Sequence, residues 1–419
     1  MTAFSSREAF AVAQLGARMH YAVARILHGA GRLERLFTDL CATTGWPALL
    51  RGSLPRALQP PPLARMLSRV PVGIPPERIS SFPGLGLGYA LRRAFDPRRA
   101  EVNPTDLWAA RAFTERIRRE GLGGAGAVYA FNLAALELLR HARERGLKTV
   151  LEQTSPPLAF EARIVSEEAV AFPGWEDFDH DAGWLQAVSE RECAEWQAAD
   201  VVVCGSPFVR DTLAASRAPL ERCVVVPYGV SPSAPVAHPE PRSGPLRVLT
   251  VGIVGLRKGS PYVLAAARAL RGTAEFRMVG PAPLRPAALA ALRAELDLAG
   301  RVPRPEMARH YTWADVFLLP SLCEGSATAS YEALAAGLPV VATPSTGSVV
   351  RDGVDGLVVP PRDVEAIAAA LGRLAADRQR LREMSARARE RAAEFTLDRY
   401  AERLLAALYG ERTGLGAAS

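Results

Sequence analysis

Short apolar segments alternate with Ala/Leu/Arg-rich amphipathic segments along this 419-residue chain. That alternation is typical of parallel α/β sheets, whose strands are buried on both faces. In the first half we expect buried strands at Phe10–Leu15, Ala127–Ala130, Thr149–Leu151, Val201–Cys204 and Val224–Val226, and helices at Leu133–Arg145 and Ala182–Ala198. The sequence therefore predicts an α/β fold class.

The same pattern starts again after residues 231–245, which contain five prolines and can form neither a helix nor a central strand. Beyond them we expect strands at Arg247–Val251, Phe276–Val279, Val316–Leu319 and Val340–Ala342. The expected helices are Pro261–Leu270, Ala287–Leu298, Ala329–Ala336, Val364–Ala376, Gln379–Glu394 and Leu397–Leu408.

These elements predict two Rossmann-like domains, residues 1–230 and residues 246–395, joined by a Pro-rich linker at 231–245. Residues 396–419 are expected to hold a helix that packs back toward the first domain. A ligand cleft should lie between the domains, because ligands of parallel sheets bind at the carboxyl ends of the strands.

The strongest functional signal is in residues 320–341, where Glu324 and Glu332 stand eight positions apart. We expect Glu324 in a strand-to-helix loop and Glu332 on the first turn of the following helix, with Ser326 between them. Backbone N–H groups around Thr328 and Ala329, at the start of that helix, would bind a phosphate. The two carboxylates suit sugar hydroxyls. The alternative is an ordinary acid-rich helix N-terminus.

The pattern Glu-x7-Glu followed by Ala-x-Gly-x-Pro-Val-Val resembles the retaining GT-B glycosyltransferases of the large group 1 family, also called family 4. The resemblance covers residues 245–410 well, and residues 188–230 also fit. It implies a GT-B fold of two Rossmann-like domains that face each other across a cleft. It further implies that Glu324 contacts the transferred sugar and that Glu332 holds the ribose of a nucleotide-diphosphate donor.

A second matching segment, 251–260, has Gly252 followed by Arg257 and Lys258. The resemblance implies that Lys258 neutralises the donor diphosphate. The family's usual arginine after the glycine is replaced by Ile253, so Arg257 is expected to supply that charge. Lysine occurs at only two of the 51 basic positions of the chain, and an arginine fork is no simple replacement for a compact ammonium. The alternative is that Lys258 is a solvated loop residue.

Two softer matches complete the expected donor site. Residues 301–321, with Val302 and Arg304, resemble the stretch where backbone groups of the family hold the nucleobase edge. In the first domain, Gly16 is the candidate for the glycine loop that touches the donor phosphate.

The acceptor side departs from the family, which often has a histidine at the end of a central strand. Residues 149–157 contain none, so we expect Glu152 or Gln153 to face the cleft, with burial or turn-capping as the alternative. Arg18 is a third acceptor-side candidate. Arg18, Arg25 and Arg32 recur every seven residues and predict a basic amphipathic helix, suited to an anionic membrane or acceptor. An ordinary solvated helix face is the alternative.

Positive charge gathers at the N-terminal end of the chain. The net charge is +7, and residues 1–100 hold 14 arginines against five acidic residues. This excess fits an anionic membrane surface or a phosphorylated acceptor. We expect no nucleic-acid partner, because neither an aromatic-and-basic stacking pattern nor a helix-turn-helix or zinc spacing is present.

No metal site is expected. The Asp-x-Asp within residues 176–181 is interpreted as a solvated acidic loop, and the six histidines show no ligand spacing. Five cysteines without a CxxC pair indicate neither a disulfide framework nor zinc. Together with the absence of a signal-peptide pattern and of a long apolar run, this predicts a cytoplasmic protein that at most associates peripherally with the inner face of a membrane.

The resulting hypothesis is a retaining, metal-independent glycosyltransferase without a cofactor. It would move a hexose from a donor such as a UDP-, GDP- or ADP-hexose to a glycan, lipid-linked or small-molecule acceptor. The resemblance implies no side-chain nucleophile: the acceptor attacks from the leaving-group face and the phosphate takes its proton. The alternative is a GT-B-like nucleotide-sugar-binding protein without transferase activity, suggested by the missing histidine and the single glycine at 16.

Overall fold

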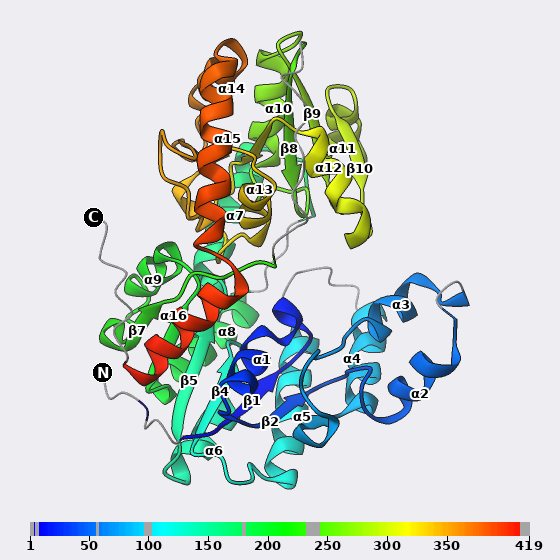
Figure 1. Ribbon diagram of the computed structural model, residues 1–419, viewed down its shortest axis with the longest axis vertical. Helices are drawn as coiled ribbons and strands as arrows, with labels where there is room; N and C mark the ends of the chain where they lie inside the picture. The colour runs from blue at the N-terminus through cyan, green and yellow to red at the C-terminus, as the bar shows by residue number, and fades with distance from the viewer. Residues whose placement is uncertain are drawn as a thin grey trace.

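The computed structural model describes residue 4 and residues 8–55, 58–95, 103–177, 182–231 and 244–410. These residues form two lobes, each built around a parallel sheet with helices on both faces (Figure 1). The predicted α/β class with two Rossmann-like sheets is confirmed. Most of the expected linker, residues 232–243, lies outside the described residues, as do residues 411–419.

Within the described residues, the sheet of the first lobe has the strand order β3-β2-β1-β4-β5-β6-β7. Its strands are β1 (Phe10–Gln14), β2 (Leu33–Thr38), β3 (Ile79–Ser81), β4 (Ala127–Phe131), β5 (Lys148–Gln153), β6 (Val201–Cys204) and β7 (Cys223–Val225). The central strands are continuous apolar runs, and β1, β4 and β6 are buried along their whole length. All pairings are parallel, so the carboxyl ends of the strands meet at one edge.

The sheet of the second lobe has the order β10-β9-β8-β11-β12-β13. Its strands are β8 (Leu246–Val251), β9 (Ala274–Val279), β10 (Asp297–Gly300), β11 (Val316–Leu319), β12 (Val340–Ala342) and β13 (Gly356–Val358). Chain order reverses between β8 and β11, so this sheet has a topological switch point at its carboxyl edge, where ligands of such sheets bind.

Helices cover both sheets. Those of the first half are α1 (Ala22–Gly29), α2 (Gly45–Ser53), α3 (Pro61–Leu67), α4 (Pro83–Phe95), α5 (Pro104–Glu120), α6 (Leu136–Glu144), α7 (Leu158–Ala171), α8 (Ala182–Ala198) and α9 (Pro207–Ala214). Those of the second half are α10 (Ser260–Ala269), α11 (Pro286–Arg293), α12 (Met307–Trp313), α13 (Thr328–Ala335), α14 (Val364–Ala376), α15 (Arg378–Ala393) and α16 (Leu397–Tyr409). None of these described helices is both long enough and apolar enough to cross a membrane.

Two sequence-based expectations for the elements are wrong, and three strands were missed. The helix expected at Ala287–Leu298 ends at Arg293, and the next residues form strand β10, which pairs with β9. The helix expected from Leu133 begins at Leu136, because Glu195 accepts the N–H groups of its first turn. Strands β2, β3 and β13 were not expected at all.

The predicted basic amphipathic helix is also wrong. Arg18 lies in a short 3₁₀ turn ahead of α1, and Arg32 follows the end of α1 at Gly29. Residues 19–21 have positive φ values, which separate Arg18 from the helix. The apolar face of α1 is buried in the core of the first lobe, so no amphipathic surface is left there for a membrane.

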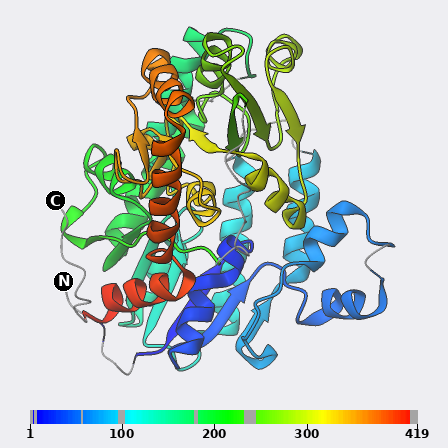
Figure 2. The same cartoon turned by 45° about the horizontal axis from the view of Figure 1, so that its top comes forward.

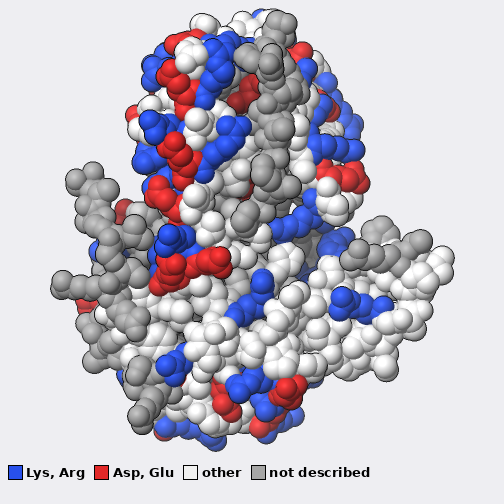
Figure 3. Space-filling view, viewed as in Figure 1, with Lys and Arg blue, Asp and Glu red and all other residues white. Residues whose placement is uncertain are grey.

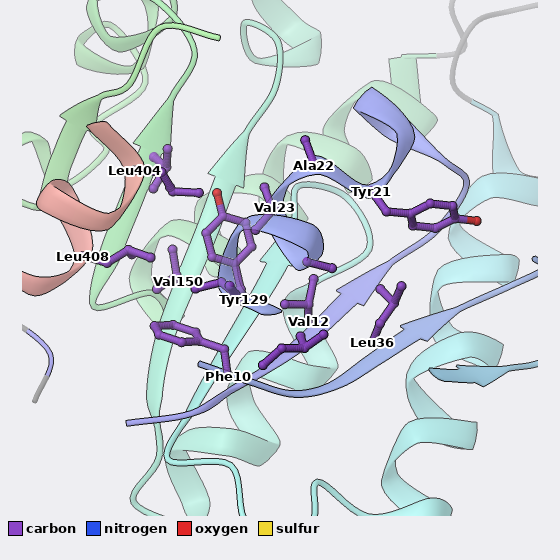
Figure 4. Packing of buried hydrophobic residues seen from close by; sticks show 14 of the residues in the cluster. Phe10, Val12, Tyr21, Ala22, Val23, Leu36, Tyr129, Val150, Leu404 and Leu408 are labelled. Atoms are coloured by element: carbon purple, nitrogen blue, oxygen red, sulfur yellow. The ribbon is translucent and has the colours of Figure 1, made fainter. Parts of the chain in front are cut away.

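The last helix of the chain completes the core of the first lobe. Figure 1 and Figure 2 show α15 leading from the second lobe to α16, which lies across the first lobe beside α1. Leu404 and Leu408 of α16 pack with Phe10, Tyr129 and Val150 of the first sheet (Figure 4). Conversely, residues 164–175, from α7 and its end, pack on the core of the second lobe. Each core therefore includes residues from the other half of the sequence.

Candidate active site between the lobes

Two loops at the carboxyl edge of the second sheet bring the strongest candidates together. Lys258, after β8, places its Nζ 2.6 Å from Oε1 of Glu324, after β11. Arg257 donates to the same oxygen over 3.0 Å and also to the carbonyl of Cys323. Both Glu324 and Lys258 are largely buried, with side chains 10% and 12% exposed. Two cations and one carboxylate thus converge at the switch point of the sheet.

Glycines allow these loops to pack so closely. A Cβ at Gly280, at the end of β9, would lie 1.8 Å from the carbonyl oxygen of Gly252, and one at Gly259 would lie 2.2 Å from that of Pro320. Gly252 itself has φ 143°, and a Cβ there would lie 3.2 Å from Cε of Lys258. Positions of this kind accept only glycine, because a side chain would push the backbones apart. The close fit fixes Lys258 against Glu324.

Glu332 lies on α13, one residue beyond the first turn where it was expected, and its carboxylate faces Tyr311 of α12. Its Oε2 accepts a 2.9 Å hydrogen bond from the Tyr311 hydroxyl, and Arg304 lies 3.8 Å from Oε1. Burial, followed by the Glu332 charge, raises the pKa of Tyr311, so its hydroxyl remains a donor. Val302 packs partly buried against the core of this lobe. Tyr311 is not among the residues that the sequence motifs indicated.

The start of α13 presents the expected backbone groups. Its N-cap is Ala327, whose side chain cannot cap the helix, and Thr328 is exposed. Ser326, by contrast, is buried and its hydroxyl contacts the Tyr331 hydroxyl at 2.8 Å. Ser326 is therefore occupied by protein contacts in this structure.

The loop after β1 reaches the second lobe. Gly16, at φ 78°, donates its N–H to Oδ1 of Asp39 over 2.8 Å. Further along this loop, Nε2 of His20 lies 2.7 Å from Nη1 of Arg304. Burial, with the charges of Arg304 and Arg25, lowers the pKa of His20, which favours the neutral ring. The loop that carries Gly16 thus faces the part of the site that holds Glu332.

Glu152 and Gln153, at the end of β5, lie in the interior of the first lobe. Both are fully buried. Glu152 accepts hydrogen bonds from the hydroxyls of Tyr129 and Tyr228, at 2.7 and 2.8 Å. Burial raises the pKa of Glu152, while these hydrogen bonds and the charge of Arg18 oppose that rise.

Gln153 accepts from the indole of Trp196 and donates to the carbonyl of Ser155. The expectation that one of these two side chains faces an acceptor therefore does not hold in this structure, and the alternative of burial does. Of the three acceptor-side candidates, Arg18 is exposed.

The two lobes meet at small residues beside Glu324. Ser206, which caps α9 in the first lobe, donates to the carbonyl of Gly325. A Cβ at Gly325 would lie 1.9 Å from the carbonyl oxygen of Thr154, just after β5. Glu161 of α7 lies 3.9 Å from Arg257. These first-lobe residues could not be predicted from the sequence, because only the fold places them beside the Glu324 segment.

The acidic segment after α7 also contacts the second lobe. Glu176 accepts the N–H of Leu256 and Asp177 pairs with Arg285, while residues 178–181 lie outside the described residues. Across the described part of the chain, no three His, Cys, Asp or Glu side chains converge as a metal-binding group.

Comparison with known proteins agrees with this architecture. Sucrose-phosphate synthase from Thermosynechococcus elongatus superposes with a TM-score of 0.66 at 20% identity, over 95% of this chain and 97% of that one. Anabaena Alr3699/HepE, solved in complex with UDP and glucose, gives a TM-score of 0.58 at 13% identity, over 96% and 100%. The two facing lobes therefore define a GT-B glycosyltransferase fold.

Residues 245–377 match the family Glycosyl transferases group 1. D-inositol 3-phosphate glycosyltransferase of Nocardia farcinica is 36% identical over 239 residues, which are 52% of this chain and 50% of that protein. A GDP-mannose-dependent alpha-(1-6)-phosphatidylinositol monomannoside mannosyltransferase of Mycolicibacterium smegmatis is 28% identical, over 57% and 69%. The chain thus spans about half the length of the first of these relatives. Its second lobe is therefore similar to the group 1 glycosyltransferases.

Proposed function

We propose that the protein is a retaining, metal-independent glycosyltransferase that moves a hexose from a nucleotide-diphosphate sugar to a glycan or lipid-linked acceptor. One observation carries this proposal: Lys258, Arg257 and Glu324 meet within hydrogen-bonding distance at the switch point of the second sheet. The group 1 relatives and the UDP-bound structural neighbour support a nucleotide-sugar donor.

The proposed division of labour follows from charge. Lys258 and Arg257 neutralise the negative charge that develops on the departing diphosphate, together with the N–H groups at the start of α13. Glu324 accepts hydrogen bonds from the hydroxyls of the transferred sugar, and Glu332, held by Tyr311, accepts those of the ribose. Gly16 and Arg304 border the donor from the two lobes. No side chain is assigned as a nucleophile.

The first experiment is a thermal-shift screen against UDP, GDP, ADP and their hexoses. A ligand present at about 100 times its dissociation constant stabilises the folded state by about 2.7 kcal/mol, which such a screen resolves. We expect one nucleobase to stabilise the protein more than the other two. No shift with any of the three would contradict the proposed donor class.

The second experiment measures sugar transfer by Glu324→Gln and Lys258→Ala. We expect both variants to bind the nucleotide and to lose about a hundredfold or more in kcat, the usual effect of removing one group that stabilises charge in the transition state. Transfer at the wild-type rate by both would remove these residues from the mechanism. Nucleotide binding by the wild type, without transfer or donor hydrolysis over a broad acceptor panel, would favour a binding protein instead.

A further inference from the structure

Three consecutive residues ahead of α1 have a left-handed backbone. Met19, His20 and Tyr21 have φ values of 47°, 51° and 60°, and none of them is glycine. L-residues avoid this region because Cβ crowds the following carbonyl oxygen, and they visit it as single residues rather than in runs. Residues 19–21, which we call the left-handed turn, are therefore a strained segment. Strain of this kind persists only where the surrounding contacts impose it.

Buried groups of the first lobe impose the conformation of the left-handed turn. Gln14, at the end of β1 and almost fully buried, donates from Nε2 to the carbonyl oxygen of Arg18 over 3.0 Å. Tyr21 is fully buried and donates its hydroxyl to the carbonyl oxygen of Leu40 over 3.1 Å. Contacts on both sides of the turn thus hold His20 in one place.

The left-handed turn carries His20 to the second lobe. Figure 1 shows the N-terminal end of α1 pointing toward that lobe. Nε2 of His20 lies 2.7 Å from Nη1 of Arg304, and Nη2 of Arg304 lies 3.8 Å from Oε1 of Glu332 on α13. The Arg304 side chain is 69% exposed. The contact with His20 therefore restricts a long side chain that its own lobe leaves largely uncovered.

The charges around His20 favour a neutral ring that accepts a hydrogen bond. A guanidinium can only donate, so Nε2 is the unprotonated nitrogen of the ring in this contact. The lowered pKa of His20, caused by burial and then by the charges of Arg304 and Arg25, agrees with that assignment. Figure 3 shows basic side chains on both lobes beside the hollow between them. A neutral imidazole can therefore orient Arg304 without adding a positive charge to this region.

We propose that His20 is a positioning residue for the donor site. It accepts a hydrogen bond from Arg304 across the cleft and holds the guanidinium beside Glu332, where the nucleoside part of the donor is proposed to bind. A nucleotide then binds more tightly, because less side-chain freedom of Arg304 is lost on binding. This inference rests on the proposed function, because it requires a nucleotide-sugar donor at Glu332.

The contact also links nucleotide binding to the arrangement of the lobes. His20 belongs to the first lobe and Arg304 to the second, so the hydrogen bond exists only while the lobes are closed against each other. By linkage, a nucleotide that engages the held Arg304 favours the closed arrangement, and the closed arrangement favours the nucleotide by the same factor. If the turn served only to bury Tyr21, changing the exposed His20 would leave nucleotide binding unaltered.

The test is calorimetric titration of the wild type and of His20 variants with UDP, GDP and ADP. His20→Asn tolerates the positive φ but is too short to reach Arg304. We expect its dissociation constant for the preferred nucleotide to rise about three- to tenfold, the range for one lost hydrogen bond. His20→Gln, whose amide oxygen can replace Nε2 as acceptor, should recover most of the affinity. The matched control, His28→Asn on α1 of the same lobe, should bind like the wild type.

A double-mutant cycle shows whether His20 acts through Arg304. Arg304→Gln should weaken nucleotide binding, and adding His20→Asn should cause no further loss, because both changes remove the same contact. A second pair of variants tests the backbone of the turn. Met19→Ile and Met19→Leu have similar volumes, but only isoleucine is branched at Cβ and resists a positive φ. We expect Met19→Ile alone to weaken nucleotide binding, by about threefold or more.

Thermal unfolding checks that each variant is folded. A wild type that binds none of the three nucleotides would contradict the proposed function, and this inference with it. If the wild type does bind a nucleotide, the inference alone is overturned by any of three results. These are wild-type affinity of His20→Asn, losses at positions 20 and 304 that simply add, and equal affinities of Met19→Ile and Met19→Leu.

Discussion

At the scale of single residues, Lys258 is held so tightly that even its replacement by arginine, which conserves the charge, should lower activity. Its ammonium lies 2.6 Å from Glu324, and its side chain lies so close to Gly252 that a Cβ there would be 3.2 Å from Cε of Lys258. A guanidinium is larger and planar, so it cannot occupy the same position. We expect Lys258→Arg to lower kcat/KM about tenfold or more, measured by sugar transfer. Arg285→Lys, on the surface pair with Asp177, is the control and should leave transfer unchanged.

A buried carboxyl on α8 should make stability depend on pH. Glu192 accepts the N–H of Leu158, and burial raises its pKa to about 8. Between its ordinary pKa of 4.5 and about 8, the folded state keeps a proton that the unfolded state loses. Stability should therefore fall as the pH rises through this window, by up to about 1.4 kcal/mol per pH unit from this group.

The variant Glu192→Gln removes this dependence, because the amide oxygen can still accept from Leu158 without carrying a charge. Denaturant unfolding should show it more stable than the wild type at pH 8 and similar at pH 5. The exposed Glu190→Gln on the same helix should follow the wild-type profile. Equal slopes for all three proteins would contradict the assignment. Glu195, whose pKa burial raises to about 7, contributes a remaining slope in both proteins.

The sequence predicted the candidate site residues of the second lobe better than those of the first. Glu324 and Lys258 stand in short glycine-rich loops directly after strands β11 and β8, which pair in the sheet, so the α/β pattern and the motifs together indicate that they meet. Glu152 stands near the carboxyl end of strand β5, yet it points into the core. The difference comes from the Tyr129 and Tyr228 hydroxyls, and Tyr228 is 76 residues away in sequence. No local pattern contains that information.

At the scale of elements, the loop after β11 depends on a glycine where the lobes touch. A Cβ on Gly325 would meet the carbonyl of Thr154 at 1.9 Å, so Gly325→Ala must separate the end of β5 from this loop. We expect a loss of about tenfold or more in kcat/KM, since small displacements of positioned groups are costly. Gly52→Ala, in α2 with open space around it, should leave transfer unchanged. Equal activity of both variants would show that the contact is dispensable.

Helix α16 is expected to stabilise a lobe far from it in sequence. Leu404 is fully buried in the core of the first lobe. Leu404→Ala should lower the free energy of unfolding by about 2–5 kcal/mol, the usual cost of removing a buried leucine side chain. Arg399→Ala, on the exposed side of the same helix, should change it by about 0.5 kcal/mol or less. Denaturant unfolding of the two variants makes the comparison.

Elements with strong apolar runs were predictable, and those that depend on their neighbours were not. Strand β2 has Glu34 and Arg35 in its first half, which obscures the apolar pattern. Strand β10, Asp297–Gly300, has little strand character of its own and exists through its pairing with β9. The spacing of the arginines suggested one helix, but the positive φ values of residues 19–21 place Arg18 outside α1. In each case tertiary context outweighed local propensity.

At the scale of the whole molecule, the seam between the lobes contains ion pairs and hydrogen bonds as well as the apolar contacts of Phe172 and Trp175. Arg362 pairs with Glu167 and Glu168 of α7, and Glu168 also accepts from the Tyr262 hydroxyl at 2.7 Å. Interfaces of this kind between domains permit relative motion more readily than large apolar ones. Donor entry and product release should therefore be accompanied by changes at the seam beside Glu324, where Ser206 of the first lobe donates to the carbonyl of Gly325.

The exchange of packing residues between the lobes also bears on how the chain is made. During synthesis the first sheet leaves the ribosome long before Tyr400, Leu404 and Leu408, which complete its core. A nascent chain that ends within α15 has all the strands of both sheets but leaves that apolar surface uncovered. Domain-by-domain folding from the N-terminus is the common order for nascent chains. Here the first lobe should reach its final packing only after the second, and until then it is the part of the chain that most needs a chaperone.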